Sequence, residues 1–134
     1  MKTLFLLLTT ALLTAAVPRP RPTAPTARNL YAGQSCVYFC RETGAVGYAY
    51  GGTNTCQAAY NYCRQYGGKF PQQVFSHYGS GYGSVALGTN ASGGRVIGTA
   101  AGYPSQAEAN QRARQECAAR GGANASVHDE WYVP

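Results

Sequence analysis

The side chains best suited to proton transfer are two histidines, His77 and His128, because imidazole is the group that titrates nearest to neutral pH. Asp129 and Glu130 directly follow His128, and Arg95 precedes it in the same half of the chain. Two imidazoles with a carboxylate would suit general acid-base cleavage of RNA, with an arginine stabilising charge on the phosphorus. That chemistry requires a fold in which the two histidines face each other.

Familiar catalytic and cofactor motifs do not occur in the sequence. It has no Gly-Lys-Ser/Thr phosphate loop, no His-Glu-x-x-His metal motif and no Gly-x-Ser-x-Gly nucleophile elbow. Histidines outside such motifs are more often surface or interface residues. We therefore predict that the chain is not an enzyme and uses neither a cofactor nor a metal ion.

The second reactive set is five cysteines, at Cys36, Cys40, Cys56, Cys63 and Cys117. Their spacing differs from the short paired spacing of zinc sites, and an oxidising compartment favours disulfides. We predict that the first four pair with each other, Cys36 with Cys63 and Cys40 with Cys56. Because the count is odd, Cys117 would remain a free or spare thiol.

The beginning of the chain indicates export. Residues 1–16 have a positive start at Lys2, an apolar run and small residues at a cleavage site, which is typical of a signal peptide. Residues 17–30 are Pro-rich and predict an extended linker or pro-segment. Residues 31–134 would then form one secreted, extracellular domain. No other apolar run approaches the roughly 20 residues that a membrane span needs.

The positive charge is concentrated before the domain. The whole chain has eleven Lys and Arg against five Asp and Glu, a formal net charge of +6. Four of the eleven cations are Lys2, Arg19, Arg21 and Arg28, so the domain keeps seven against five, or +2. This balance does not favour nucleic acid as a partner. We expect neither nucleic acid nor membrane as a partner, and a monomeric domain.

The late helix has the clearest pattern. Ser105 and Glu108 form a capping-box pair, and Ala109, Ala113 and Cys117 recur every four residues on one face. Gly121 and Gly122 would end the helix. Glu108 and Arg112 predict an ion pair on another face. A helix with such a small apolar face can pack closely on a sheet.

The elements around this helix indicate two copies of one plan, each strand, strand, helix, strand. Cys63 and Cys117 both lie four residues before a Gly-Gly pair. Thr55 would cap the earlier helix, with Cys56, Tyr60, Cys63 and Tyr66 facing inward. We predict an α+β fold, mainly antiparallel sheet with two helices packed on one face, and either a duplicated unit or two unrelated runs of this order. The expected strands cover residues 35–39, 45–50, 74–78, 84–87, 95–101 and 125–132.

Three resemblances accompany this pattern. Gly81 to Ser84, Val96 to Gly98, the Ser-capped helix and Cys117 are similar to a family of small secreted domains of unknown function. The cysteines, short length and Pro-rich leader resemble secreted effectors of filamentous (fungal) plant pathogens, a class that includes inhibitors of host proteases. The segment from Cys36 to Cys40 resembles fungal guanyl-type ribonucleases, although Gln72 stands where their His after Pro would lie.

Recognition of a protein is the expected function. From Gln72 to Ser84, Tyr alternates with Gly and Ser, a composition typical of protein-binding loops. Gln72 to Ser76 resembles the Gln-x-Val-x-Gly loop of cystatin inhibitors of papain-like proteases, and Trp131 their Trp-bearing loop. The predicted partner-binding residues are Gln73, Val74, Phe75, His77, Tyr78, Tyr82 and Trp131.

We therefore expect a non-enzymatic effector that binds a host extracellular protein in the apoplast and inhibits a papain-like cysteine protease to suppress defence. The alternatives are a secreted ribonuclease or ribotoxin, and an antimicrobial or wall-associated structural protein. Asn90 and Asn124 begin Asn-Ala-Ser sequons and are predicted N-glycosylation sites.

Overall fold

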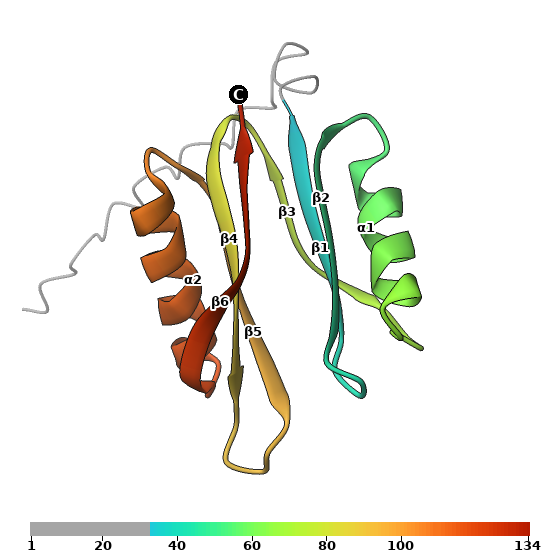
Figure 1. Ribbon diagram of the computed structural model, residues 1–134, viewed down its shortest axis with the longest axis vertical. Helices are drawn as coiled ribbons and strands as arrows, with labels where there is room; N and C mark the ends of the chain where they lie inside the picture. The colour runs from blue at the N-terminus through green and yellow to red at the C-terminus, as the bar shows by residue number, and fades with distance from the viewer. Residues whose placement is uncertain (1–32) are drawn as a thin grey trace, which may run out of the picture.

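The computed structural model describes residues 33–134 as two successive units of the same order (Figure 1). The predicted signal peptide (1–16) and linker (17–30) lie outside the described residues. The first unit consists of β1 (Gln34–Cys40), β2 (Ala45–Gly52), α1 (Thr55–Gln65) and β3 (Gln72–Tyr78). The second unit consists of β4 (Gly81–Thr89), β5 (Arg95–Tyr103), α2 (Gln106–Ala119) and β6 (Ala123–Val133).

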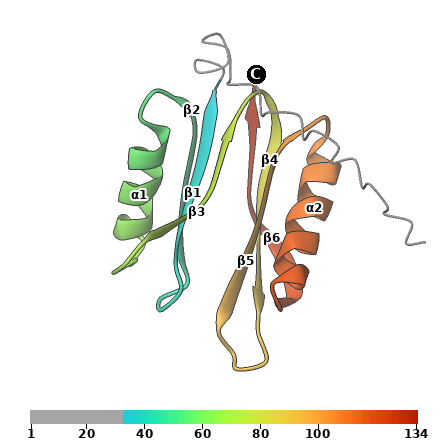
Figure 2. The same cartoon turned by 180° about the vertical axis from the view of Figure 1, so that it is seen from behind.

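The strands form two antiparallel three-stranded sheets, in the orders β2-β1-β3 and β5-β4-β6. The two sheets stand face to face, and each helix covers the outer face of the sheet of its own unit (Figures 1 and 2). The prediction of a mainly antiparallel α+β fold is confirmed, and the order strand, strand, helix, strand occurs twice. The expectation of one sheet with both helices on one face is wrong, because each unit forms its own sheet and the two helices lie on opposite outer faces.

The strand registers show that the two units correspond residue by residue. Tyr38 pairs with Gly47 in the first unit, as Ala86 pairs with Gly98 in the second. The register between the first and last strands shifts just after Val37 in one unit and just after Val85 in the other. A β-bulge at the same point of both units supports a common plan, because bulges are specific local features of a strand pair.

The main core lies between the sheets. It is formed by aliphatic and aromatic side chains that are at most 6% exposed, namely Val37, Phe39, Val46, Val85, Leu87, Ile97, Trp131 and Val133. The indole Nε1–H of Trp131 donates a hydrogen bond of 2.9 Å to the hydroxyl of Ser35. Because both residues are buried and belong to different units, this bond satisfies two polar groups and fixes one sheet against the other.

Small residues allow each helix to lie close to its sheet. Ala113 and Cys117 of α2 are fully buried over the second sheet. A Cβ atom added to Gly98 of β5 would stand 2.1 Å from the carbonyl oxygen of Ala113, far inside van der Waals contact. The same clash, also at 2.1 Å, would arise between Gly47 of β2 and Ala59 of α1. Glycine at these two positions is therefore a condition of the helix-sheet packing.

The predicted start of α2 is confirmed, because the hydroxyl of Ser105 accepts from the backbone N–H of Glu108 at 3.2 Å. The predicted ion pair between Glu108 and Arg112 is wrong. Arg112 instead pairs with Glu116 one turn later, at 2.6 Å. Glu108 is occupied at the cap, where its carboxylate accepts from the Ser105 hydroxyl.

The predicted orientation of α1 is wrong in part. Asn54, not Thr55, precedes the helix, and the Thr55 hydroxyl donates to the carbonyl of Gly52. The buried face consists of Thr55, Ala59 and Cys63, whereas Tyr66 is 66% exposed. The close approach over Gly47 selects the small side chain of Ala59, while Tyr60 is half-buried with its ring packed on Tyr38 of β1.

The predicted disulfide pairing is also wrong. The bond joins Cys36 of β1 to Cys56 in the first turn of α1, with Cα atoms 5.0 Å apart. Cys40 and Cys63 are free thiols, buried together with Ala45 under α1. Cys63 is buried near the end of α1, whereas Cys56 lies in its first turn. The strand residue Cys36 therefore meets Cys56 and not Cys63. Cys117 is a free buried thiol, as predicted.

Candidate functional site

The structure separates the two histidines. His128 lies on β6 and lines a cavity with residues of β2, whereas His77 lies on β3 and lines a different cavity beside β5. Glu130, proposed as a companion, accepts a hydrogen bond of 2.6 Å from Asn110 of α2. The paired-imidazole arrangement considered for RNA cleavage is therefore not formed by these side chains.

His128 instead shares a cavity of about 460 Å³ with side chains of both units, on the flank where β2 and β6 adjoin. Its Nδ1 is 2.5 Å from the Oδ2 of Asp129. A carboxylate in this position favours a proton on Nδ1 and leaves Nε2 as the free ring nitrogen. Tyr48, Tyr66 and Arg95 line the same cavity.

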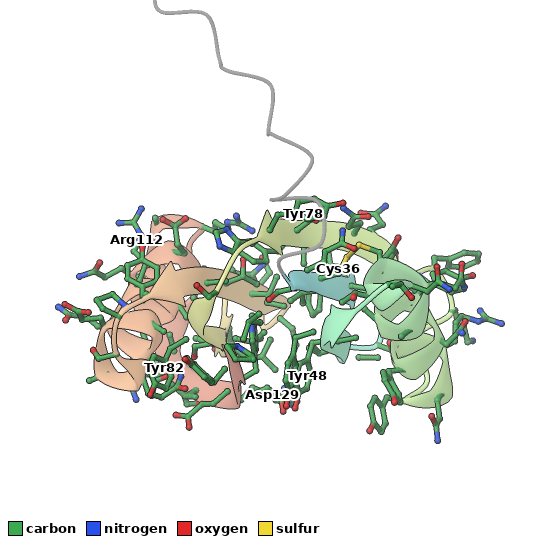
Figure 3. All side chains as sticks on the ribbon, turned by 90° about the horizontal axis from the view of Figure 1, so that it is seen from above. Cys36, Tyr48, Tyr78, Tyr82, Arg112 and Asp129 are labelled. Atoms are coloured by element: carbon green, nitrogen blue, oxygen red, sulfur yellow. A yellow bond between two sulfur atoms is a disulfide. The ribbon has the colours of Figure 1, made fainter. Side chains whose placement is uncertain are left out.

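Tyr48 connects this cavity to the core. Figure 3 shows Tyr48 and Asp129 side by side on this flank, with Tyr78 on the opposite one. Burial raises the pKa of the Tyr48 hydroxyl above its ordinary value, and the negative charge of Asp129 raises it further. The ring of Tyr48 stacks on Trp131 with centroids 5.7 Å apart. Tyr48 is thus a neutral group whose position is fixed by the core.

A groove of about 380 Å³ adjoins the cavity, and we call it the tyrosine groove. It is lined by Tyr48, Ala49 and Tyr50 of β2 and by Tyr62 and Tyr66 at the end of α1. Tyr48 and Tyr66 line both hollows, so the two form one continuous concave surface. Tyr50, Tyr62 and Tyr66 are 48%, 46% and 66% exposed. Three large rings therefore present much of their surface to solvent at one place.

The second unit has the equivalent groove without the tyrosines. The equivalent positions, from the strand registers and helix faces, are Thr99, Ala100, Ala101, Glu116 and Arg120, and all five line one cavity beside β5. The fold thus forms a hollow at these positions in both units, and the five positions hold four tyrosines in the first unit and none in the second, where Tyr103, Phe75 and His77 line the cavity from other positions. The tyrosines are a property of this site and not a requirement of the architecture.

The predicted partner-binding residues have mixed positions. Trp131 is only 4% exposed, so its selection as a contact residue is wrong, because the ring belongs to the core between the sheets. Val74 and Phe75 are half-buried against the same core. Gln72–Tyr78 is the paired strand β3 and not a free loop.

Of the remaining predicted residues, His77, Tyr78 and Tyr82 lie beside the β3–β4 connection, whereas Gln73 lies at the other end of β3. Gln73 and Tyr78 are exposed, while His77 and Tyr82 are half-buried. Tyr82 packs on Tyr132, with ring centroids 4.7 Å apart. Asn90 and Asn124 are both exposed, so their positions are accessible to a modifying enzyme.

Sequence reasoning missed Tyr48, Tyr50 and Tyr62 as site residues and placed Tyr66 inside. A signal was present. Tyr62 and the C-cap residue Tyr66 are four residues apart at the end of α1, and Tyr48 and Tyr50 are two apart on a strand. Each pair therefore lies on one face of its element. That these two faces lie side by side could not be predicted from the sequence, because it depends on how α1 crosses β2.

Comparisons with protein-family models, with curated proteins and with solved structures gave no match. Among residues 33–134, no helix is long and apolar enough to cross a membrane. Nor do three His, Cys, Asp or Glu side chains of that range gather closely enough to hold a metal ion. The function must therefore be argued from the site itself.

Proposed function

We propose that this chain is an exported, non-enzymatic binding protein that holds an extended segment of a partner protein in the tyrosine groove. The observation that carries the proposal is the difference between the two equivalent grooves. Four positions that carry tyrosine in the first unit carry Thr99, Ala101, Glu116 and Arg120 in the second, whose cavity also contains Phe75, His77 and Tyr103 from neighbouring positions. The concentration of four tyrosines at one of two equivalent sites supports a recognition role for that site.

The physical properties of the groove favour a protein as its occupant. Tyrosine provides a large surface with an apolar ring and a polar hydroxyl, and it loses little conformational entropy on binding. Stacking also limits the motion of two of these tyrosine rings in the unbound protein. Tyr48 and Tyr50 stack on each other and on Trp131, with centroid distances of 5.7–6.4 Å. Such preorganisation reduces the entropic cost of association.

The strand that lines the groove favours an extended segment. β2 is an edge strand, since its sheet has the order β2-β1-β3. Alternate backbone N–H and C=O groups of an edge strand point away from the sheet and can pair with an added strand. The tyrosines of β2 and α1 would contact side chains of that added strand. Backbone pairing would supply affinity and the rings would supply selectivity.

The neighbouring cavity supports binding more than turnover. Burial and the charge of Asp129 raise the pKa of Tyr48 and arginine stays protonated, so neither exchanges a proton readily near neutral pH, while the carboxylate of Asp129 is engaged by Nδ1 of His128. Concerted acid-base catalysis needs a donor and an acceptor that both work at the operating pH. His128, Asp129 and Arg95 would instead provide polar contacts at one end of the bound segment.

The proposal also includes a specific partner and role. The partner would be an extracellular host protein, with a papain-like protease as the concrete candidate, and the chain would act as a secreted effector. The bond between Cys36 and Cys56 suits an oxidising compartment. Because Trp131 is buried and Gln72–Tyr78 is a strand, inhibition would depend on the tyrosine groove and not on a cystatin-like pair of loops.

A display selection of random peptides against the immobilised protein tests this proposal without knowledge of the natural partner. We expect selected peptides to bind the wild type and to lose at least about tenfold in affinity to Tyr66→Ala or Tyr62→Ala, since truncation of a central aromatic contact commonly costs 2 kcal/mol or more. Tyr78→Ala is the matched control, because Tyr78 is similarly exposed and lies on the opposite flank.

Selected peptides that bind all variants equally, or that lose affinity only with Tyr78→Ala, would refute the groove as the binding site. A parallel assay adds the protein to papain and, separately, to RNA. Stoichiometric slowing of papain that is lost in Tyr66→Ala would support the protease candidate. Catalytic loss of RNA that disappears in His128→Ala would contradict the non-enzymatic assignment.

A further inference from the structure

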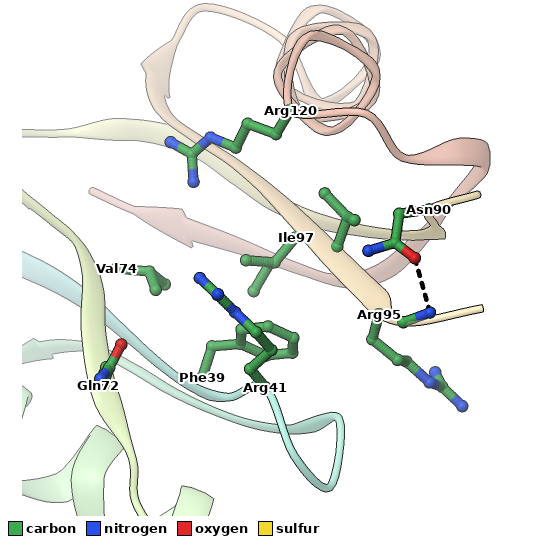
Figure 4. A pocket seen from close by; sticks show the side chains of 10 residues that line it. Phe39, Arg41, Gln72, Val74, Asn90, Arg95, Ile97 and Arg120 are labelled. Carbon is green, nitrogen blue, oxygen red and sulfur yellow. Dashed lines mark hydrogen bonds between the residues drawn. The ribbon is translucent and has the colours of Figure 1, made fainter. Parts of the chain in front are cut away.

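The flank opposite the tyrosine groove, where β3 and β5 adjoin, holds a cleft of about 420 Å³ with a different chemistry. Its floor is apolar and includes Phe39, Val74 and Ile97, which come from both units. Arg41 and Arg120 stand at its opening. Figure 4 shows both of these guanidinium groups directed over Val74, from two sides of the cleft. We call this the arginine cleft.

Two guanidinium groups of the arginine cleft form no ion pair in the described part of the chain. They belong to Arg41 and Arg120, and no Asp or Glu lines the cleft. Glu42 follows Arg41 in the chain, but its carboxylate contacts the thiol of Cys40 at 3.2 Å. Glu116, one turn before Arg120, pairs with Arg112.

A third arginine adds to the positive electrostatic potential of the arginine cleft. Arg95 also lines the cleft, although its aliphatic stem crosses Gly44 of the β1–β2 turn and its guanidinium points away from Val74 (Figure 4). The described domain has seven Lys and Arg, so three of its seven cations lie at one hollow. Of the three, Arg41 and Arg120 converge, and they repel each other because no carboxylate lines the cleft, so an anion placed between them would relieve that repulsion.

The fold does not require these arginines. The equivalent positions of the other unit are Thr89 for Arg41, Gly44 for Arg95 and Tyr66 for Arg120. None of the three equivalents is charged, and two of them, Gly44 and Tyr66, line the cavity on the opposite flank. The arginines are therefore specific to the flank of β3 and β5, as the four tyrosines are specific to the flank of β2 and β6.

We propose that the arginine cleft binds a small ligand that carries a phosphate or sulfate group on an apolar body. Guanidinium groups donate paired N–H groups to such oxyanions, and these charge-assisted hydrogen bonds are stronger than neutral ones. Arg41 and Arg120 would hold the oxyanion from two sides. The floor of Phe39, Val74 and Ile97 would receive the apolar part, and the volume is in the range of small-molecule sites.

Isothermal titration of the purified chain tests the site with four probes: phenyl phosphate, phenyl sulfate, inorganic phosphate and the neutral benzyl alcohol. We expect at least one phenyl ester to bind more tightly than inorganic phosphate, and benzyl alcohol not to bind. Whichever ester binds more tightly indicates whether the natural ligand is a phosphate or a sulfate. Arg41→Gln and Arg120→Gln should each weaken that ester at least about tenfold, because each removes a charge-assisted hydrogen bond.

Arg114→Gln is the matched control. Arg114 is exposed on α2 and does not line the cleft, so this variant makes the same change in net charge elsewhere. Equal weakening by Arg114→Gln would reduce the effect to net charge and overturn the proposal. So would the failure of both esters to bind, or binding that survives Arg41→Gln and Arg120→Gln. Because Tyr62 and Tyr66 lie on the other flank, these outcomes are independent of the tyrosine groove.

Discussion

At the scale of the residue, two of the three free cysteines, Cys63 and Cys117, behave as buried apolar groups. Cys117 lies on the buried face of α2, and its thiol donates to the carbonyl of Val96 at 3.3 Å. Burial raises the pKa of Cys117 above the ordinary thiol range, with the same direction and cause for Cys63. Both side chains therefore stay protonated in the folded protein at pH values where an unfolded chain would begin to lose these protons.

This raised pKa gives a stability that depends on pH. The contribution of Cys117 is complete below the pKa of an unfolded thiol, about 8.5, and is lost as the pH rises above that value. We expect the free energy of unfolding of the wild type to fall more steeply between pH 8.5 and pH 10 than that of Cys117→Ala, by up to about 1.4 kcal/mol per pH unit. Urea denaturation at several pH values measures both slopes. Identical slopes would contradict the assignment of a raised pKa.

At the scale of the element, most of the strands and helices could be predicted from the sequence. Alternation and turn residues located all six strands, and the Ser105 cap and glycines located α2. The face of α1 could not be predicted in the same way. Hydrophobicity favours Tyr60 and Tyr66 inside, whereas close contact with Gly47 selects Ala59. The disulfide pairing was wrong for the same reason, because it depended on which face of α1 meets the sheet.

The packing of α2 on Gly98 gives a direct test at this scale. Gly98→Ala would place a methyl group against the helix backbone, 2.1 Å from the carbonyl oxygen of Ala113 and 2.3 Å from the nitrogen of Cys117. Backbone atoms cannot rotate away, so we expect a loss of at least about 1–3 kcal/mol in the free energy of unfolding.

The control for this prediction is Gly52→Ala at the end of β2. A Cβ atom there would meet its nearest neighbour, the Oγ1 of Thr55, at an ordinary distance of 3.6 Å. Thermal or urea unfolding should show a change within about 0.5 kcal/mol for this variant. Equal stability of the two alanine variants would show that α2 does not depend on the close approach.

At the scale of the whole molecule, the repeated order of strands and helix produces two flanks that carry different side chains. One flank carries the tyrosine groove with His128 and Asp129, and the other carries the arginine cleft. The repeat was recognisable in the sequence from Cys63, Cys117 and the glycines that follow them. The two sites could not be recognised in the sequence, because one forms between a strand and a helix and the other between β-strands of different units. Their residues come together only after the sheets have packed.

Binding of the proposed partner segment in the tyrosine groove should protect the backbone amides of one edge strand from hydrogen exchange. Amide hydrogen exchange, measured with and without a selected peptide, reports this change for each segment of the chain. The account predicts slower exchange in Ala45–Gly52 of β2, with no change in the equivalent strand Arg95–Tyr103 of β5. Protection confined to Gln72–Tyr78 of β3, or protection that appears equally in β2 and β5, would contradict the assignment of partner binding to the tyrosine groove.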